Sequence, residues 1–204
     1  MERRQLLKMI MAASGVAMVG GNALAYEMGS PVALSATQFN QDDVMLFNDI
    51  AEVILPRTDT PGAKDANVGL MALILANDCY NTKEREQFVK GFQSLNKLTQ
   101  NKYGKPFLLL STEQKSKFVK GLDKEAKTYN KKQEIYYVPA TSFDRYASEE
   151  NPVVPHFFTM IKQLTIFTFF TSKEGATKVL RYEAIPGKYN GELDYKKGDR
   201  AWAT

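Results

Sequence analysis

Residues 153–170 read VVPHFFTMIKQLTIFTFF, and this stretch decides the fold of the 204-residue chain. Apolar side chains fall on nearly every face of the helix that it predicts, so that helix has to be covered on all sides. The run is a poor membrane span because it is interrupted by Pro155, His156, Lys162 and Gln163. We therefore expect a central helix that is buried either by the chain's other helices or by another subunit.

The segments before this stretch also have helical periodicity, and the sequence shows little strand signal. Residues 37–55 carry an apolar stripe made of Val44, Phe47, Ile50, Ala51 and Ile54. Residues 68–80 are nearly all apolar. A helix that begins at Asn81 or Thr82 has the stripe Phe88, Phe92, Leu95 and Leu98, and one that begins at Ser111 or Thr112 has the stripe Phe118, Leu122, Ala126 and Tyr129. The predicted fold is all-α: a compact helical domain with long loops and an irregular aromatic C-terminal tail.

Local signals refine this prediction at two places. Asn81 is followed three residues later by Glu84, which predicts a capping box at the start of a helix. Residues 60–63 read TPGA, and Pro followed by Gly at the central positions predicts a type II turn. Asp42 and Asp43 lie in the first turns of a predicted helix, where negative charge stabilises the helix. We therefore interpret this pair as part of the helix start and not as an acid–base pair.

The N-terminus has the features of an export signal. An arginine pair precedes a short apolar run, a pattern that resembles the signal of the twin-arginine translocase, which moves folded proteins. The residues that we assign to this signal are Arg3, Arg4, Leu6, Leu7 and Lys8. Glu2 and Leu6 depart from the usual residues of that signal, and an ordinary secretory signal with an accidental arginine pair is the alternative.

A cleavage site follows the apolar run. Ala23 and Ala25 flank Leu24 in the small-x-small pattern that signal peptidase recognises. We expect residues 1–25 to be a twin-arginine signal peptide and residues 26–204 to form one domain in the periplasm.

The usual catalytic and metal-binding residues are nearly absent. His156 is the only histidine and Cys79 the only cysteine, so the sequence offers no intrachain disulfide, no attached c-type haem and no zinc site. We expect His156 to be a hydrogen-bonded structural residue and Cys79 to be a small buried apolar residue. No catalytic, cofactor-binding or metal-binding residue is assigned.

The charge balance gives little sign of a polyanionic partner. The net charge is +4, and it is +2 without residues 1–25, which carry three basic residues and one acidic residue. We therefore expect no nucleic-acid partner. The helix after Ser111 has a lysine-rich face made of Lys115, Lys117, Lys120, Lys124 and Lys127. Because acids interleave with these lysines in the sequence, we interpret this face as solvated.

The C-terminal tail, residues 182–204, has no helical or strand period but is rich in aromatic residues. They are Tyr182, Tyr189, Tyr195 and Trp202. Several exposed aromatics on one soluble protein favour aggregation, so we expect them to be covered. The tail either folds back on the chain's own helices or lies across a partner.

Two blocks of sequence carry a resemblance to a known family. They are ILPRTDTPGA at residues 54–63 and FTSKEGATKVLRYEAIPGKYNG at residues 170–191, joined by the terminal GDRAWAT. Together they resemble the gluconate 2-dehydrogenase subunit 3 family, the small subunits of periplasmic flavin dehydrogenases. The similarity covers essentially all of the chain after the signal segment.

The resemblance implies a function in a complex. The partner would be a large flavoprotein subunit of the glucose–methanol–choline oxidoreductase fold that contains FAD and oxidises a sugar, a sugar acid or a polyol. In many such complexes a c-type cytochrome carrying haem accepts the electrons. The small subunit would carry no redox centre and would support maturation and twin-arginine export of the flavin subunit. The residues expected at the partner interface are Arg57, Asp59, Pro61, Tyr182, Ile185, Pro186, Tyr189 and Trp202.

Two other functions remain open at the level of the sequence. One is a stand-alone enzyme that uses Asp59, His156 or scattered acids. The other is a free-standing periplasmic binding or envelope protein with no flavoprotein partner.

Overall fold

The computed structural model describes residues 34–135, 154–185, 187–188, 190–194 and 196–203. It divides into two units, residues 1–36 and 37–204. In the first unit only the short 3-10 helix η2 (Leu34–Ala36) is described. The predicted signal residues Arg3, Arg4, Leu6, Leu7, Lys8, Ala23 and Ala25 lie outside the described residues, as do Pro186, Tyr189 and Tyr195.

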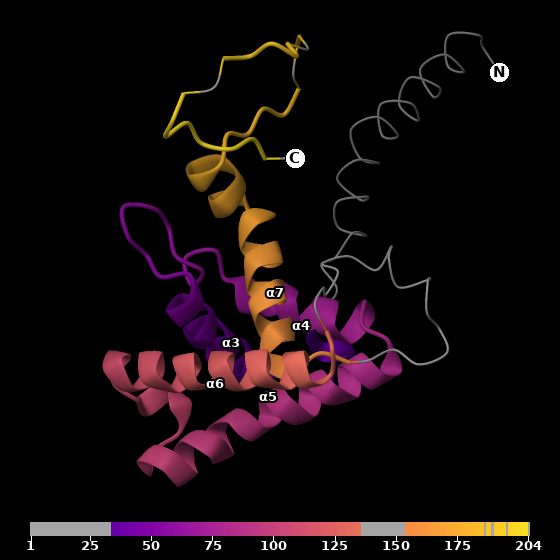
Figure 1. Ribbon diagram of the computed structural model, residues 1–204, viewed down its shortest axis with the longest axis vertical. Coiled ribbons are helices and arrows are strands. Elements are labelled where there is room, and N and C mark those ends of the chain that lie inside the picture. The colour runs from indigo at the N-terminus through magenta and orange to yellow at the C-terminus, as the bar shows by residue number, and fades with distance from the viewer. Residues whose placement is uncertain (1–33, 136–153, 186, 189, 195, 204) are drawn as a thin grey trace, which may run out of the picture. The chain divides into compact units, whose positions relative to one another are not determined.

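The second unit is helical throughout its described elements (Figure 1). The elements are α3 (Gln41–Ile54), α4 (Val68–Asp78), α5 (Thr82–Tyr103), the 3-10 turn η3 (Phe107–Leu109), α6 (Thr112–Lys132), α7 (Phe157–Phe170) and the π-helical turn η5 (Gly175–Val179). The described residues form no strand, and their only extended pairing is an isolated bridge between Arg181 and Trp202. The all-α prediction is confirmed.

Helix α7 is the centre of this unit, as the sequence predicts. It contacts α3, α4, α5 and α6 (Figure 1). Its buried side chains come from several faces: Phe157, Phe158, Met160, Ile161, Leu164, Thr165, Thr168 and Phe169. The chain's own helices therefore provide the cover, and only Ile166 and Phe167 are left substantially exposed. No helix in the described part of the chain is long and apolar enough to cross a membrane.

Three helices begin with a capping box. In this motif the side chain of the N-cap residue accepts a hydrogen bond from the backbone amide three residues later, and the side chain of that later residue accepts one from the N-cap amide. The pairs are Asn40 with Asp43, Asn81 with Glu84, and Ser111 with Gln114. The first explains why α3 begins at Gln41 rather than near residue 37. It also gives Asp43 a specific structural function beyond general helix-start electrostatics.

Aromatic rings fill the core between α3, α5 and α7. Phe88 and Phe92 stack with centroids 5.8 Å apart, and Phe39 meets both rings edge-on. The predicted stripe of α5 holds except at its last position, since Leu98 is exposed and the neighbouring Thr99 is buried instead.

Two sequence-based predictions about single side chains are wrong. Cys79 is exposed rather than buried, because α4 ends at Asp78 and Cys79 is its C-cap. Lys115 is not part of a fully solvated lysine face, since its ammonium group binds the Asp49 carboxylate and its side chain is only 17% exposed.

Candidate functional site

The loop between α3 and α4, residues 55–67, is the most heavily braced irregular segment of the described chain. Glu52, on the last turn of α3, accepts hydrogen bonds from the backbone amides of Arg57 (2.8 Å) and Lys64 (2.9 Å). The Ala63 amide donates to the Leu55 carbonyl at 2.9 Å. One carboxylate and one carbonyl thus hold both ends of the loop against the end of the helix.

This bracing changes the turn that the sequence predicts at residues 60–63. A type II turn requires a positive φ at Gly62, and Gly62 does not have one. The glycine is needed for another reason: a Cβ at this position would lie 2.6 Å from the Glu52 carboxylate oxygens. The prediction of a type II turn is therefore wrong, and close approach of the backbone to Glu52 explains the glycine.

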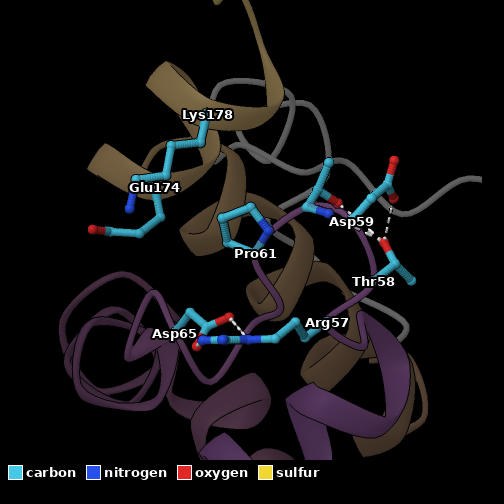
Figure 2. A pocket seen from close by; sticks show the side chains of 8 residues that line it. Arg57, Thr58, Asp59, Pro61, Asp65, Glu174 and Lys178 are labelled. Atoms are coloured by element: carbon cyan, nitrogen blue, oxygen red, sulfur yellow. Dashed lines mark hydrogen bonds and ion pairs between the residues drawn. The ribbon is translucent and has the colours of Figure 1, made fainter.

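A second carboxylate, Asp65, fixes the outer side of the loop. Asp65 Oδ2 accepts from the Gly62 amide at 2.9 Å and from Arg57 Nε at 2.7 Å, and Asp65 Oδ1 pairs with Arg57 Nη2 (Figure 2). The Arg57 side chain remains 68% exposed beyond this pair. It therefore presents a guanidinium group whose position is set but whose outer edge faces solvent.

A third carboxylate lies under the loop. Asp49 binds the ammonium groups of Lys64 and Lys115, and so joins the loop to α3 and α6. Burial of Asp49 disfavours its ionised form, but the hydrogen bonds and charges of the two lysines outweigh burial and lower its pKa below 3.8. Asp49 is therefore ionised at neutral pH and holds the loop electrostatically.

The pocket beside this loop has a second wall from the far end of the chain. Glu174 and Lys178, on the helical turn after α7, also line the pocket, and in the view of Figure 2 they lie on the other side of Pro61 from Thr58 and Asp59. The remaining lining residues are Arg57, Thr58, Asp59, Thr60, Pro61 and Asp65. The pocket has a volume of about 430 Å³.

Local geometry explains how the second wall is positioned. Ser172 Oγ accepts from the Gly175 amide at 3.0 Å and donates to the Phe169 carbonyl at 2.6 Å. A Cβ on Gly175 would lie 2.0 Å from that same carbonyl. Only glycine lets the chain fold this tightly against the end of α7, and the π-helical turn that begins there carries Lys178 to the pocket.

The C-terminal segment starts next to this wall and returns to it. Arg181 exchanges backbone hydrogen bonds with Ala201 and Ala203, both 2.8 Å long. Its guanidinium carbon lies 4.7 Å from the centroid of the Trp202 ring. Arg200 donates to the Lys178 carbonyl at 2.9 Å, which ties the end of the chain to the pocket wall.

This segment leaves its large apolar side chains open to solvent. Tyr182, Ile185, Leu193 and Trp202 are 57%, 82%, 52% and 48% exposed. No described residue from Tyr182 to Ala203 is buried. The sequence analysis leaves two ways to cover these side chains: the chain's own helices or a partner. The chain's own helices do not bury them.

The structure brings most of the predicted interface residues into one region. Arg57, Asp59 and Pro61 line the pocket, while Tyr182, Ile185 and Trp202 lie on the segment that leaves its second wall. Sequence reasoning did not single out Glu174 and Lys178. Their spacing could have indicated them, since residues four apart on a helical turn lie on the same face.

The chemistry of this pocket suits polar contacts with a protein. Its walls carry two cations, three carboxylates and two threonines, with Pro61 as its only apolar ring. A flavin site is instead a concave cleft lined mainly by apolar and aromatic side chains, so these residues do not fit that cofactor. The described residues also contain no group of three or more His, Cys, Asp and Glu side chains placed to hold a metal ion.

His156 has a structural function at the other end of α7. It is the N-cap of this helix, and its Nδ1 accepts from the Phe158 amide at 3.2 Å. Its own amide donates to the Asn130 side chain, and its ring lies against Tyr129 and Phe157. Burial lowers the pKa of His156, partly opposed by Glu125 at 3.9 Å. The prediction of a hydrogen-bonded structural histidine is confirmed.

The fold and the site define a small all-α protein whose most organised surface is a braced, polar pocket beside an exposed aromatic segment. The family model for gluconate 2-dehydrogenase subunit 3 matches residues 41–187, from α3 through both walls of the pocket. The chain therefore belongs to the gluconate 2-dehydrogenase subunit 3 family. The terminal residues GDRAWAT lie beyond the matched range. No curated protein and no solved structure gave a match.

Proposed function

We propose that this protein is the non-catalytic small subunit of a periplasmic or membrane-associated flavin dehydrogenase complex. The observation that carries the proposal is the family match over residues 41–187, since the family takes its name from the third subunit of gluconate 2-dehydrogenase. In this proposal a large subunit holds FAD and oxidises a sugar, a sugar acid or a polyol, and a c-type cytochrome with its haem accepts the electrons.

The chemistry of the described residues supports a non-catalytic subunit. His156 is occupied as a helix cap, and Asp59 accepts a hydrogen bond from Thr58 at the surface of the loop. Among the described residues, neither belongs to a group of three or more His, Cys, Asp and Glu side chains that could hold a metal ion. A subunit of this kind contributes to the complex through the surfaces that it offers to its partners.

The surface proposed for the flavin subunit is the pocket between residues 57–65 and Glu174 and Lys178, together with the exposed segment that contains Tyr182, Ile185 and Trp202. It combines fixed charges with exposed aromatic and aliphatic side chains. Interfaces are typically built this way, with aromatic and arginine anchors inside a polar rim.

The second part of the proposal concerns export. Flavin is inserted into a folded protein in the cytoplasm, so the loaded subunit has to cross the membrane folded. The twin-arginine pattern at Arg3 and Arg4 supplies a signal for that route. We propose that this chain supports maturation of the flavin subunit and carries it through the translocase to the periplasm.

Purified protein tests the non-catalytic part. Expressed without partners, the chain should be colourless, free of flavin and haem absorbance, and inactive in a dye-linked dehydrogenase assay. Stoichiometric flavin bound to the isolated chain, or oxidation of a sugar by it, would contradict the proposal. A monomer that retains a small ligand and has no flavoprotein partner would favour a free-standing binding protein instead.

A further inference from the structure

Helix α6 carries a straight stripe of lysines on the side opposite its core-facing residues. Lys117, Lys120, Lys124, Lys127 and Lys131 recur at intervals of three, four, three and four residues, and all five are exposed. This spacing keeps side chains on one face of a helix. At 1.5 Å per residue the stripe is about 21 Å long.

Of the acidic residues that interleave with these lysines in the sequence, Asp123 is shared with α7 and Glu125 lies beside the start of α7. Asp123 is turned towards α7, where it binds Lys162 at 2.6 Å as well as Lys127 at 2.7 Å. Glu125 is turned towards the start of α7, 3.9 Å from His156. The sequence-based reason for treating this face as charge-balanced therefore fails, and Glu113 at the start of the helix is the one acid in line with the stripe.

Four of the five lysines form no ion pair within the described part of the chain. Lys127 pairs with Asp123, whereas Lys117, Lys120, Lys124 and Lys131 form no ion pair with a described residue. A row of exposed like charges repels itself, and an anionic surface brought against it relieves that repulsion.

We propose that the α6 lysine stripe docks this protein on the anionic phospholipid headgroups of a membrane surface. Clusters of four to eight basic residues on a helix are typical of sites for anionic lipids. The apolar side of α6 is committed to the core through Phe118, Val119, Leu122 and Ala126, so the contact is electrostatic and does not insert into the bilayer.

The composition of the stripe favours lipid over a protein partner. Protein interfaces are depleted in lysine and enriched in arginine and aromatic residues. The stripe contains lysine alone, and lysine acts as a hydrated point charge without the geometry of a guanidinium group. Such a row suits mobile headgroups, which adjust to the charges, better than a fixed protein surface.

The position of the stripe leaves the pocket free. Helix α6 is joined to the first half of α7 through Asn130, which bonds His156, and through Asp123, which bonds Lys162. The second wall of the pocket, Glu174 and Lys178, follows the other end of α7 in the chain. The stripe and the pocket can therefore be occupied together, and the docking goes beyond the proposed partner function without requiring it.

Vesicle co-sedimentation tests the inference. The probes are vesicles of phosphatidylcholine mixed with phosphatidylglycerol and vesicles of phosphatidylcholine alone. The full chain should bind only the anionic vesicles, and added salt should release it. Replacing Lys117, Lys120, Lys124 and Lys131 by Gln should weaken binding on the order of 1000-fold, whereas Arg at the same positions should preserve it.

A matched control removes the same charge at the opposite end of α7, through Gln at Lys173, Lys188, Lys196 and Lys197, and should bind like the unmodified chain. All variants share residues 1–33, so any contribution from that region cancels in the comparison. Equal weakening in both variants, salt-independent binding, or no binding by the unmodified chain would overturn the proposal. So would tighter retention on double-stranded DNA, or loss of a protein partner by the stripe variant with vesicle binding unchanged.

Discussion

The Arg181 guanidinium lies 4.7 Å from the centre of the Trp202 ring, and this contact closes residues 182–201 into a loop beside the candidate site. The loop is attached to the helical domain at Arg181 and through the bond from Arg200 to the Lys178 carbonyl. The domain core does not depend on it, because no described residue from Tyr182 to Ala203 is buried.

The first prediction concerns Trp202. Trp202→Ala, or deletion from Gly198 onward, should leave the thermal unfolding of the isolated protein unchanged but weaken its binding to the flavin subunit. Truncation of a tryptophan at the centre of an interface costs about 2–4 kcal/mol, which corresponds to roughly 30- to 1000-fold in affinity. Pull-down and thermal unfolding measure the two effects separately. A truncated protein that lost its unfolding transition would show that the segment supports the core.

The second prediction concerns the brace under the pocket loop. Glu52→Gln replaces one acceptor oxygen by an NH₂ group that faces a backbone amide donor. The unsatisfied donors should cost about 1–3 kcal/mol. At about 2–4 °C per kcal/mol for a chain of this size, the melting temperature should fall by several degrees, and partner binding should weaken as the loop loosens.

Glu86 on α5 provides the matched control, since it is exposed. Glu86→Gln removes the same charge and should change neither the melting temperature nor partner binding. A Glu52 variant as stable as this control would show that the loop does not need the brace.

How much of this site the sequence could predict depends on which interactions form it. The central helix, the Asn81 cap and the structural histidine follow from local patterns, namely apolar runs and cap residues at fixed spacing. The Pro-Gly turn is not of the predicted type because Glu52 binds the amides of Arg57 and Lys64 on either side of it and Asp65 binds the amide of Gly62 itself. The pocket was not predictable from local patterns, since Arg57 and Lys178 are over a hundred residues apart in the chain.

The lysine stripe on α6 shows the same limit for charges. Asp123 and Glu125 stand between lysines in the sequence, yet Asp123 divides its carboxylate between Lys127 and Lys162 of α7, and Glu125 lies beside His156 at the start of α7. Sequence order gives the charge balance of a helix, and tertiary partners decide which side chains remain on each face.

The third prediction concerns pH. Burial lowers the pKa of His156 below 6.5, so the unfolded chain binds the extra proton first as the pH falls. The stability due to neutral His156 is therefore fully present above pH 6.5 and is lost as the pH drops from there towards the folded pKa. His156→Asn keeps a capping acceptor without this titration.

Denaturant unfolding at a series of pH values measures this effect. The unmodified protein should lose more stability than His156→Asn between about pH 7 and pH 5. Asp49 and Asp123, whose pKa values are lowered below 3.8, should add losses only at more acidic pH, as they become protonated. Identical profiles for the two proteins near neutral pH would contradict the structural role assigned to His156.

The fourth prediction concerns export. Replacing Arg3 and Arg4 together by Lys removes the planar guanidinium pair while keeping the charge. Both this chain and the flavin subunit should then stay in the cytoplasm, as measured by fractionation and dehydrogenase assay. Normal periplasmic activity in the double variant would show that the flavin subunit does not depend on this signal.

The central claim is that this chain works as a subunit of a flavoprotein complex, and co-purification from the cells that make it tests this most directly. A tagged chain should bring down a large subunit in stoichiometric amount, with flavin absorbance and dye-linked dehydrogenase activity that disappear when that subunit is removed. Isolation of the tagged chain alone, or with flavin that stays bound to it after the subunits are separated, would contradict the account.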